Sequence, residues 1–357
     1  MQWVGGFVAG LLGTAIIAGL VLSRDALGPI AGGNGPAPPE LISPEGVAVG
    51  PDGTVYVSDW IGDRVFKIAS GGRLVAVAGG GTKRDGPATQ AWLNHPSALA
   101  VDGNGNLFIA DSIAGTIRRV DRHGVITTVA YTDAPLGLAI DADGLLYAAN
   151  YIGEIHVIDP AGASGTIDLS SLPAPAPQFS YIAFDKAGDL YAVDRAPVPA
   201  GQFATAAGGC RVIRLTRAQS HTKLPLNWSI RVVAGTGKCG YSGDRGPATS
   251  AELNNPAGIA FDSAGFMYVA DTDNHRIRRI SPDGVIVTVA GTGVEGYSGD
   301  GGPALSAELA DPAGMAIGRG DLLYIADATC GCMSPATNGR VRVLNTTGGT
   351  ITTLVHG

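Results

Sequence analysis

Basic charge, cysteine and helical patterning are all scarce in this chain of 357 residues. Lysine and arginine number 24 against 31 aspartate and glutamate residues, so the formal net charge is −7 and no basic footprint is present. Nucleic acids and other polyanions are therefore not expected as partners. Charged side chains make up only 15% of the chain and hydrophobic ones 45%, which is enough to bury a large core.

Amphipathic helical periodicity is absent beyond the N-terminal segment, whereas glycine, with 54 residues, is abundant. Short β-prone stretches joined by turns of Asp and Gly occur instead. In the clearest copy, residues 259–261 and 267–270 flank a tight turn, and residues 276–280 alternate arginine with isoleucine. Residues 285–290 add a fourth stretch, so the unit predicts four antiparallel strands.

This unit recurs along the chain with small changes in its residues. Its copies span residues 44–68, 96–120, 135–158, 180–215, 256–280 and 312–344. Units of this size cannot bury a core alone and must pack against one another. The sequence therefore predicts an all-β fold, a six-bladed β-propeller of four-stranded antiparallel blades over residues 42–357. An open β-solenoid is the alternative, but it needs a shorter and more uniform period.

The residues of this unit also carry a family resemblance. Pro256-Ala257-Gly258-Ile259-Ala260, followed by Tyr268-Val269-Ala270-Asp271-Thr272-Asp273-Asn274-His275-Arg276-Ile277, resembles the NHL repeat. The resemblance implies a propeller. It does not fix a function, because proteins similar to it include receptor sensor domains, adhesion propellers, ligase-associated binding modules and a few lyases or lactonases.

The first 23 residues differ in kind from the rest. From Trp3 to Leu22 only Thr14 is not apolar or small, which predicts one N-terminal transmembrane helix acting as an anchor. A cleaved signal peptide is the alternative, but no Lys or Arg precedes Trp3. Gly6 and Gly10 form a GxxxG motif that could pack against a partner helix. Residues 24–41 are rich in Pro and Gly and predict a linker.

The propeller is expected on the extracytoplasmic side of the membrane, as a single-pass protein or as a secreted one after cleavage. Arg24, with Asp25 beside it, is the only basic residue near the span, so charge hardly fixes the orientation. The expectation depends on the type of segment, the even number of cysteines and the resemblance to exported propellers.

Strand order decides which connections share a face of the propeller. Connections between the second and third strands, and those between blades, emerge together, and the long insertions fall in these classes. They cover residues 79–93, 160–179, 195–209, 235–253, 291–309 and 328–339. Because loops on a rigid scaffold usually carry binding, we expect a ligand at this face, with only tight turns opposite.

Candidate ligand-binding residues lie in these insertions. Three interblade loops are near copies. Two of them contain Tyr241 with Asp244 and Tyr297 with Asp300, and the third keeps a shortened form at Asp85-Gly86-Pro87-Ala88. For the two Tyr–Asp pairs, loops that pack on themselves and seal adjacent blades are favoured over contact with a ligand. His275, from the repeat motif, and Arg195, at the start of an insertion, complete the set.

An aspartate recurs at the end of the second strand of most copies. The set is Asp59, Asp111, Asp194, Asp271 and Asp327, with Asn150 in the third copy. An arginine opens the third strand of four copies, at Arg64, Arg211, Arg276 and Arg340. Turn capping or Asp–Arg pairing that locks each blade is favoured over catalysis.

The cysteines predict a disulfide. Cys210 begins the third strand of the fourth copy, and Cys239 follows the fourth strand of that blade, so a bond between them would brace it. Cys330 and Cys332 form a C-x-C for which a local disulfide is favoured over a soft metal or free thiols.

No metal or cofactor is expected. The acidic turns beginning at Asp102 and Asp141 lack the rest of a calcium loop, and the histidines offer no matching zinc set. The G-x-G-x-x-G runs at 235–240 and 291–296 are followed by strands, not by the helix that a dinucleotide site requires. No catalytic residues can be named.

These observations favour a membrane-anchored binding or scaffold propeller that recognises a protein, peptide or glycan and has no chemistry of its own. Two alternatives stay open. One is a metal-dependent lyase or lactonase working at the propeller channel. The other is an accessory subunit of a membrane complex that uses the Gly-rich helix.

Overall fold

The computed structural model describes residues 40–172, 177–195, 209–217, 228–328 and 339–356. The apolar segment from Trp3 to Leu22 lies outside these residues, as do Cys330 and Cys332. Within the described ranges, no helix has the length and apolar character needed to span a bilayer.

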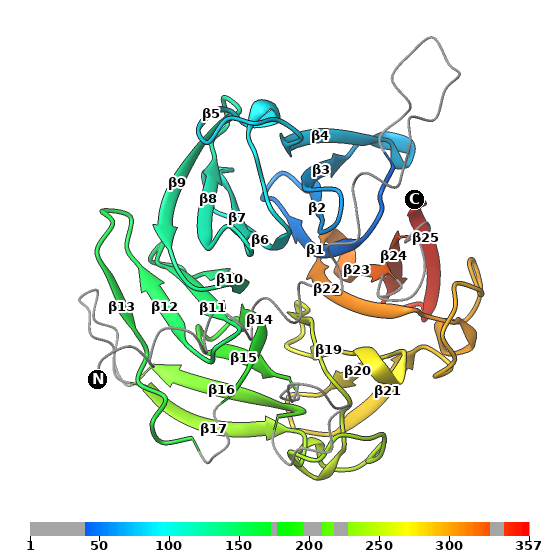
Figure 1. Cartoon of the computed structure of the whole chain (residues 1–357). Coiled ribbons are helices and arrows are strands. Elements are labelled where there is room, and N and C mark those ends of the chain that lie inside the picture. The colour runs from blue at the N-terminus through cyan, green and yellow to red at the C-terminus, as the bar shows by residue number, and fades with distance from the viewer. Residues whose placement is uncertain (1–39, 173–176, 196–208, 218–227, 329–338, 357) are drawn as a thin grey trace, which may run out of the picture.

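Six antiparallel sheets are arranged as a ring (Figure 1), which confirms the six-bladed propeller. Each blade is built from four consecutive strands, and the first of the four lies innermost. The strands are β1 (Pro44–Val49), β2 (Val55–Asp59), β3 (Arg64–Ile68) and β4 (Leu74–Gly79) in blade 1; β6 (Pro96–Val101), β7 (Leu107–Asp111), β8 (Thr116–Val120) and β9 (Val125–Tyr131) in blade 2; β10 (Pro135–Ile140), β11 (Leu146–Asn150), β12 (Ile155–Ile158) and β13 (Ser164–Thr166) in blade 3; β14 (Phe179–Phe184), β15 (Leu190–Asp194), β16 (Arg211–Arg217) and β17 (Trp228–Ala234) in blade 4; β18 (Ile259–Phe261), β19 (Met267–Asp271), β20 (Arg276–Ile280) and β21 (Ile286–Ala290) in blade 5; and β22 (Asp311–Ile317), β23 (Leu322–Ala328), β24 (Arg340–Asn345) and β25 (Thr350–His356) in blade 6.

The near-copy loops each reach the outer edge of the following blade. Ahead of blade 2, the short strand β5 (Gly86–Pro87) pairs with β9 and makes a fifth strand. Ahead of blades 5 and 6, Pro247 bridges to Val285 and Pro303 bridges to Thr350. These contacts cover outer strands that would otherwise expose unpaired backbone groups.

The core lies between neighbouring blades, because both faces of each sheet are covered. The second strands are mostly buried, as in β19, where every residue from Met267 to Asp271 is buried. In β20 the isoleucines at 277 and 280 are buried, while Arg276 and Arg279 are partly exposed. Ile277 and Ile280 point to opposite faces of the strand and Arg278 is buried as well, so both faces of this third strand are covered.

In four of the six blades the innermost strand approaches the next blade too closely for a side chain. A Cβ at Gly46, Gly137, Gly258 or Gly314 would collide with a backbone carbonyl of the following blade. Gly314 makes this contact with Glu45, so blade 6 meets blade 1 in the same way as other neighbours meet. Within the described part of the chain no strand is exchanged between blades, so these residues close the ring by packing.

Side-chain hydroxyls reinforce these contacts near the channel. Ser58 Oγ donates to the carbonyl of Ser97 at 2.6 Å, which joins blade 1 to blade 2. Ser180 Oγ donates to Ala257 O at 2.9 Å, and Thr272 Oγ1 donates to Pro312 O at 2.8 Å. Buried hydroxyls are therefore used to join adjacent blades.

The prediction that all long connections share one face is wrong for blade 4. Residues 218–227 join β16 to β17, and a connection from third to fourth strand lies on the face of the tight turns. The reason is that copy four extends its third strand to Arg217 and resumes a strand pattern only at Trp228.

Closure of the ring at Gly314 can be tested by adding one methyl group. Gly314→Ala would place Cβ 2.8 Å from Gly46 Cα and 3.0 Å from the Tyr181 hydroxyl, so the backbone must shift. We expect a loss of about 1–3 kcal/mol in the free energy of unfolding, measured by urea denaturation. Gly103→Ala is the control, because a Cβ there meets open space. Equal stability of the two variants would contradict the packing argument.

Candidate functional site

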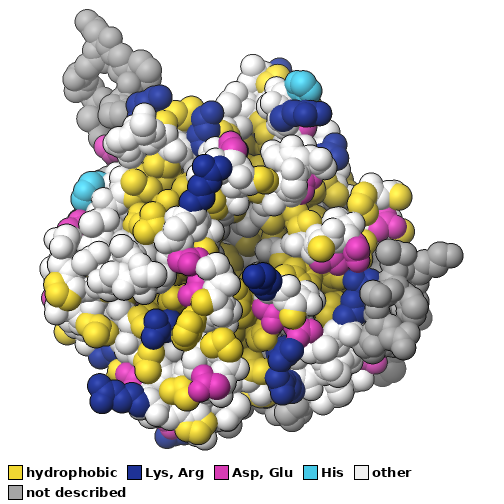
Figure 2. Space-filling view, turned by 180° about the vertical axis from the view of Figure 1, so that it is seen from behind, with side chains coloured by type: hydrophobic (Ala, Val, Ile, Leu, Met, Phe, Trp, Pro, Cys, Tyr) yellow, Lys and Arg dark blue, Asp and Glu magenta, His cyan; other side chains and the backbone are white. Residues whose placement is uncertain are grey.

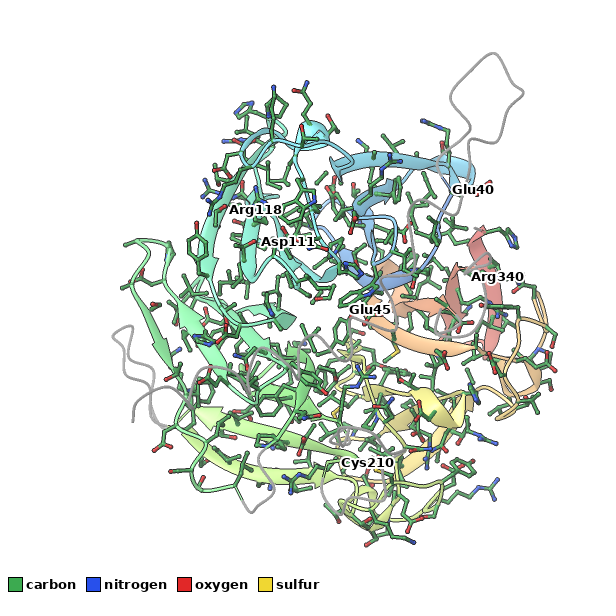
Figure 3. All side chains as sticks on the ribbon, viewed as in Figure 1. Glu40, Glu45, Asp111, Arg118, Cys210 and Arg340 are labelled. Atoms are coloured by element: carbon green, nitrogen blue, oxygen red, sulfur yellow. A yellow bond between two sulfur atoms is a disulfide. The ribbon has the colours of Figure 1, made fainter. Side chains whose placement is uncertain are left out.

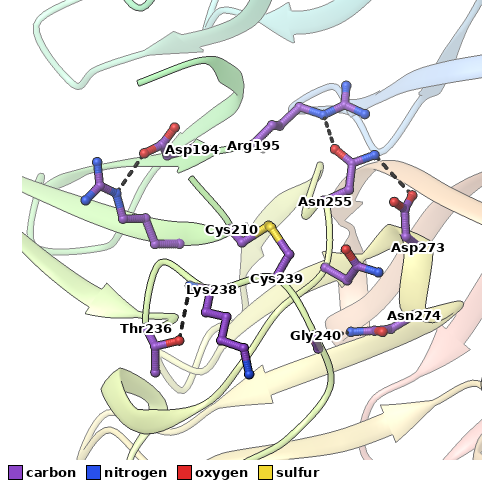
Figure 4. Close-up of a disulfide and its surroundings, with 12 residues drawn as sticks. Asp194, Arg195, Cys210, Thr236, Lys238, Cys239, Gly240, Asn255, Asp273 and Asn274 are labelled. Carbon is purple, nitrogen blue, oxygen red and sulfur yellow. Dashed lines mark hydrogen bonds and ion pairs between the residues drawn. A yellow bond between two sulfur atoms is a disulfide. The ribbon is translucent and has the colours of Figure 1, made fainter. Parts of the chain in front are cut away.

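The described side chains at the loop-bearing mouth of the central channel form a polar network. Arg195 follows β15 directly, and its Nε donates to Asn255 Oδ1 at 3.0 Å (Figure 4). Asn255 Nδ2 in turn donates to Asp273 Oδ1 at 3.0 Å. The network joins blade 4 to two loops of blade 5, one before β18 and one after β19. It therefore fixes the direction of the Arg195 guanidinium.

Tyr181 closes the channel beneath this network. Its hydroxyl donates to the backbone carbonyl of Glu45 at 2.8 Å. Tyr181 belongs to blade 4, which lies across the ring from blade 1 (Figure 1), so the side chain spans the channel. The other five blades have only Gly or Ala at this position, namely Gly46, Ala98, Gly137, Gly258 and Gly314. A ligand at this mouth would therefore rest on a phenol ring.

Glu45 places a carboxyl group beside Tyr181, toward the centre of the ring (Figure 3). Although part of its side chain is exposed, it is densely surrounded, and burial raises the pKa of the Glu45 carboxyl. Arg195 and the Tyr181 hydroxyl act in the opposite direction, and Asp311 adds to the rise. The mouth thus combines a guanidinium, a desolvated carboxyl group and a phenol.

Sequence reasoning found Arg195 but missed Glu45, Tyr181 and Asn255. The signal for Tyr181 was present, because an aromatic residue replaces Gly or Ala at one position of an aligned repeat. Glu45 is similarly the only charged residue at its position, where the other copies have Ser97, Leu136, Ser180, Ala257 and Ala313. Comparison among copies would have identified both residues.

His275 lies at the junction of blades 5 and 6. It adopts a left-handed conformation with φ of 52°, and its Nδ1 contacts the carbonyl oxygen of Ala310. The Asp311 carboxylate is 3.8 Å from the same nitrogen. These contacts give His275 a position between blades, and its role in ligand binding stays a prediction.

The disulfide between Cys210 and Cys239 is present, with 5.3 Å between the two Cα atoms. It joins the start of the third strand of blade 4 to the loop that follows β17 (Figure 4). Arg195 begins the connection that ends at this strand, so the crosslink braces the blade that carries the network.

A buried arginine binds two carboxylates in three of the blades. Arg278, with no exposed surface, is 3.0 Å from Asp271 and 2.8 Å from Asp244. Arg342 makes the same pair of contacts with Asp327 at 3.7 Å and Asp300 at 3.0 Å. Arg118 does so with Asp111 at 3.5 Å and Asp85 at 3.1 Å (Figure 3). We call each set an Asp–Arg–Asp clamp.

The clamps correct the expected pairing of the recurrent aspartates. Only Asp194 binds the predicted partner, Arg211, at 2.7 Å. Elsewhere the partner is the arginine two residues farther along the third strand, because that side chain lies beneath the interblade loop and is buried. Asp59 instead accepts backbone N–H groups from Ile42, Ser43 and Gly62.

The predicted loop residues lie at the outer part of this face. Asp244 and Asp300 are the loop members of two clamps. Tyr241 donates to or accepts from Thr288 Oγ1 at 3.0 Å, and the Arg276 guanidinium lies 4.0 Å above its ring. Tyr297 lies under Arg340 in the same way, at 4.2 Å. The structure does not bring these four residues together with Arg195, and their role toward a ligand stays a prediction.

Metal ligands were also sought among the residues that the structure describes. Those residues contain no group of three or more His, Cys, Asp or Glu side chains placed to hold a metal ion.

Comparison with known proteins agrees with this architecture. The family model for the Teneurin NHL domain matches residues 130–296. Human Teneurin-1 is 31% identical over 277 residues, which is 71% of this chain and 9% of Teneurin-1. The chain therefore spans about a tenth of the length of that relative.

Solved structures with similar folds show only the architecture, because their sequences are distant. An auxiliary nutrient binding protein from Bacteroides thetaiotaomicron superimposes with a TM-score of 0.62 at 16% identity, covering 81% of this chain and 67% of its own. Catalytically inactive virginiamycin B lyase from Staphylococcus aureus, with quinupristin, gives 0.52 at 16% identity, covering 88% and 84%. The protein is thus a six-bladed β-propeller. Within that class, the chain belongs to the NHL-repeat family.

The clamps predict a large effect from one arginine and a small one from its neighbour. Arg278→Met leaves the Asp271 carboxylate buried without a cation, and we expect a loss of about 3–5 kcal/mol in the free energy of unfolding. Arg279→Met removes a partly exposed cation 4.7 Å from the Phe266 ring, for which we expect about 1 kcal/mol or less. Chemical denaturation measures both, and similar losses would contradict the clamp.

The clamp of blade 6 predicts a pH dependence of stability. Burial raises the pKa of the Asp327 carboxyl to about 7, although Arg342 opposes the rise. Because this value exceeds that of an unfolded aspartate, about 4, the folded state retains a proton that the unfolded chain releases between these values. The free energy of unfolding should therefore fall as the pH rises from about 4 to about 7.

Urea denaturation across this range should show wild type losing stability relative to Asp327→Asn, which cannot ionise. Asp121→Asn is the control. Hydrogen bonds, mainly from Val125 N–H, lower the pKa of the exposed Asp121 carboxyl, so its contribution changes only below about pH 4. A constant difference between wild type and Asp327→Asn would contradict the prediction.

Proposed function

We propose that this protein is an extracytoplasmic binding propeller that recognises a protein, peptide or glycan at the loop-bearing mouth of its channel. The observation that carries this proposal is the network from Arg195 through Asn255 to Asp273. Among the described residues, Asn255 is the only hydrogen-bond acceptor for Arg195, and the terminal guanidinium nitrogens do not bond to any of them. A fixed guanidinium with free donors suits a carboxylate or amide ligand.

The position of Tyr181 supports a ligand that binds at the surface of the propeller and does not pass through its channel. The side chain spans the channel, so a ligand would contact Arg195, Glu45 and the phenol ring from one side only. A rigid aromatic surface flanked by charged groups is typical of binding sites. The disulfide supports an oxidising compartment.

Attachment to a membrane is the second part of the proposal. The apolar residues from 3 to 22 would form the anchor, and residues 24–41 would tether the propeller. Gly6 and Gly10 would allow a second helix to pack closely against this anchor. Protease treatment of intact cells that contain the full chain would test the proposed orientation, by showing which of the two termini is protected from digestion.

A matched pair of arginine variants tests the binding face. Peptide and glycan arrays probed with the full chain would first identify a ligand. Arg195→Ala should then weaken its affinity at least about tenfold, since one charge-assisted hydrogen bond contributes more than about 1.4 kcal/mol. Arg245→Ala, an exposed arginine of an interblade loop, should leave the affinity unchanged. An unchanged affinity for Arg195→Ala would refute the proposed site.

A further inference from the structure

On the opposite face, one carboxylate closes the turn and holds a tyrosine in three consecutive blades. The tyrosine of the second strand donates to the aspartate that ends the first, at 3.1, 3.2 and 2.9 Å. The pairs are Tyr147 with Asp141, Tyr191 with Asp185 and Tyr268 with Asp262. The other oxygen of each carboxylate accepts two N–H groups of its own turn, as in Asp262 with Ala264 and Phe266.

Blades 1 and 6 retain the tyrosine but lack the carboxylate, since Gly318 precedes Tyr324 in blade 6 as Gly50 precedes Tyr56 in blade 1. Gly50 occupies the position of the aspartate, and Tyr56 occupies that of the tyrosine. Asp52, two residues later, is engaged with the N–H and hydroxyl of Thr54. Within the described residues, the Tyr56 hydroxyl therefore has no hydrogen-bond partner, although blades 3, 4 and 5 provide one.

A groove of about 530 Å³ opens where this carboxylate is missing, between the turns of blades 1 and 2. Gly50, Tyr56 and Lys67 line it from blade 1, and Asn104 and Arg122 line it from blade 2. Its apolar floor consists of Val77, Val101, Leu107 and Val120. Figure 2 shows this side of the disc, with hollows between the blades and Lys and Arg side chains on their rims. The volume is within the range of small-molecule sites.

The charges that line the groove are unequally engaged. Asp52 is satisfied by Thr54, and Asp121 accepts from the N–H groups of His123 and Val125. Neither Lys67 nor Arg122 makes an ion pair or hydrogen bond to the residues that the structure describes. The cations are therefore available to a ligand, whereas the carboxylates are occupied by their own turns.

We propose that this groove binds an acidic monosaccharide of the hexuronate class. The carboxylate of the sugar would pair with Lys67 and Arg122, and the C–H face of its ring would cover the apolar floor. Its hydroxyls would meet the Tyr56 hydroxyl and the Asn104 amide, together with backbone groups at Gly50. A bare inorganic anion would leave the apolar floor uncovered, and an apolar acid would leave the phenol and amide without partners.

Titration calorimetry of the full chain with galacturonate tests this site, with glucose and hexanoate as comparison ligands. Galacturonate should bind, and the two comparison ligands should bind at least tenfold more weakly. Lys67→Ala and Arg122→Ala should each lower the affinity for galacturonate at least tenfold. Gly50→Asp should abolish binding, because it restores the carboxylate that blades 3 to 5 use to hold the tyrosine. Its Cβ would lie 2.9 Å from the exposed Asp52 carboxylate and at ordinary contact distance from the Tyr56 ring, 3.6 Å, and Thr54 O, 3.7 Å.

Arg73→Ala is the matched control, since Arg73 is an exposed cation on the same blade and face outside the groove. It should bind galacturonate as wild type does, and thermal unfolding should show that all four variants remain folded. The proposal is overturned if wild type does not bind galacturonate, if glucose or hexanoate binds equally well, or if folded Gly50→Asp binds normally. This site is independent of Arg195, so the Arg195→Ala variant should retain it.

Discussion

The close contact between the inner strand of one blade and the backbone of the next is the constraint on which the rest of the structure depends. At Gly46, Gly137, Gly258 and Gly314 the following blade fills the space of a side chain. Because blade 6 meets blade 1 by the same contact, the ring needs no shared strand to close. The same constraint gives Tyr181 its effect, since a large side chain at this position can be accommodated only by crossing the channel.

Departures from the repeat mark the places where the blades differ in chemistry. Tyr181 seals the channel, Arg195 extends from the end of β15 over its mouth, and Gly50 opens the groove on the other face. Positions that keep the pattern instead serve packing, as the Tyr–Asp pairs of blades 3, 4 and 5 do. This agrees with the general observation that local rules are broken mainly at functional sites.

Much of the fold could be predicted from the sequence, because the repeat states the strand period, the turn residues and the number of blades. The disulfide followed from placing Cys210 and Cys239 on neighbouring ends of one blade. The ion-pair partner of Asp271 could not be identified from its spacing along the sequence, since Arg276 and Arg278 lie on the same side of β20. Burial decides between them. Both guanidinium groups lie over the Tyr241 ring, but Arg276 is partly exposed, whereas Arg278 has no exposed surface and binds two carboxylates.

The clamps also bear on which loop residues are free to meet a ligand. An arginine at this position of the third strand occurs in blades 2, 5 and 6, which are the blades that the near-copy loops precede. Blades 1, 3 and 4 have Phe66, Val157 and Ile213 there, and no such loop. The loop aspartates and the buried arginines thus form one structural unit. A ligand that used Asp244 or Asp300 would compete with a buried guanidinium, whereas Arg195 makes no ion pair with the described residues that a ligand would have to break.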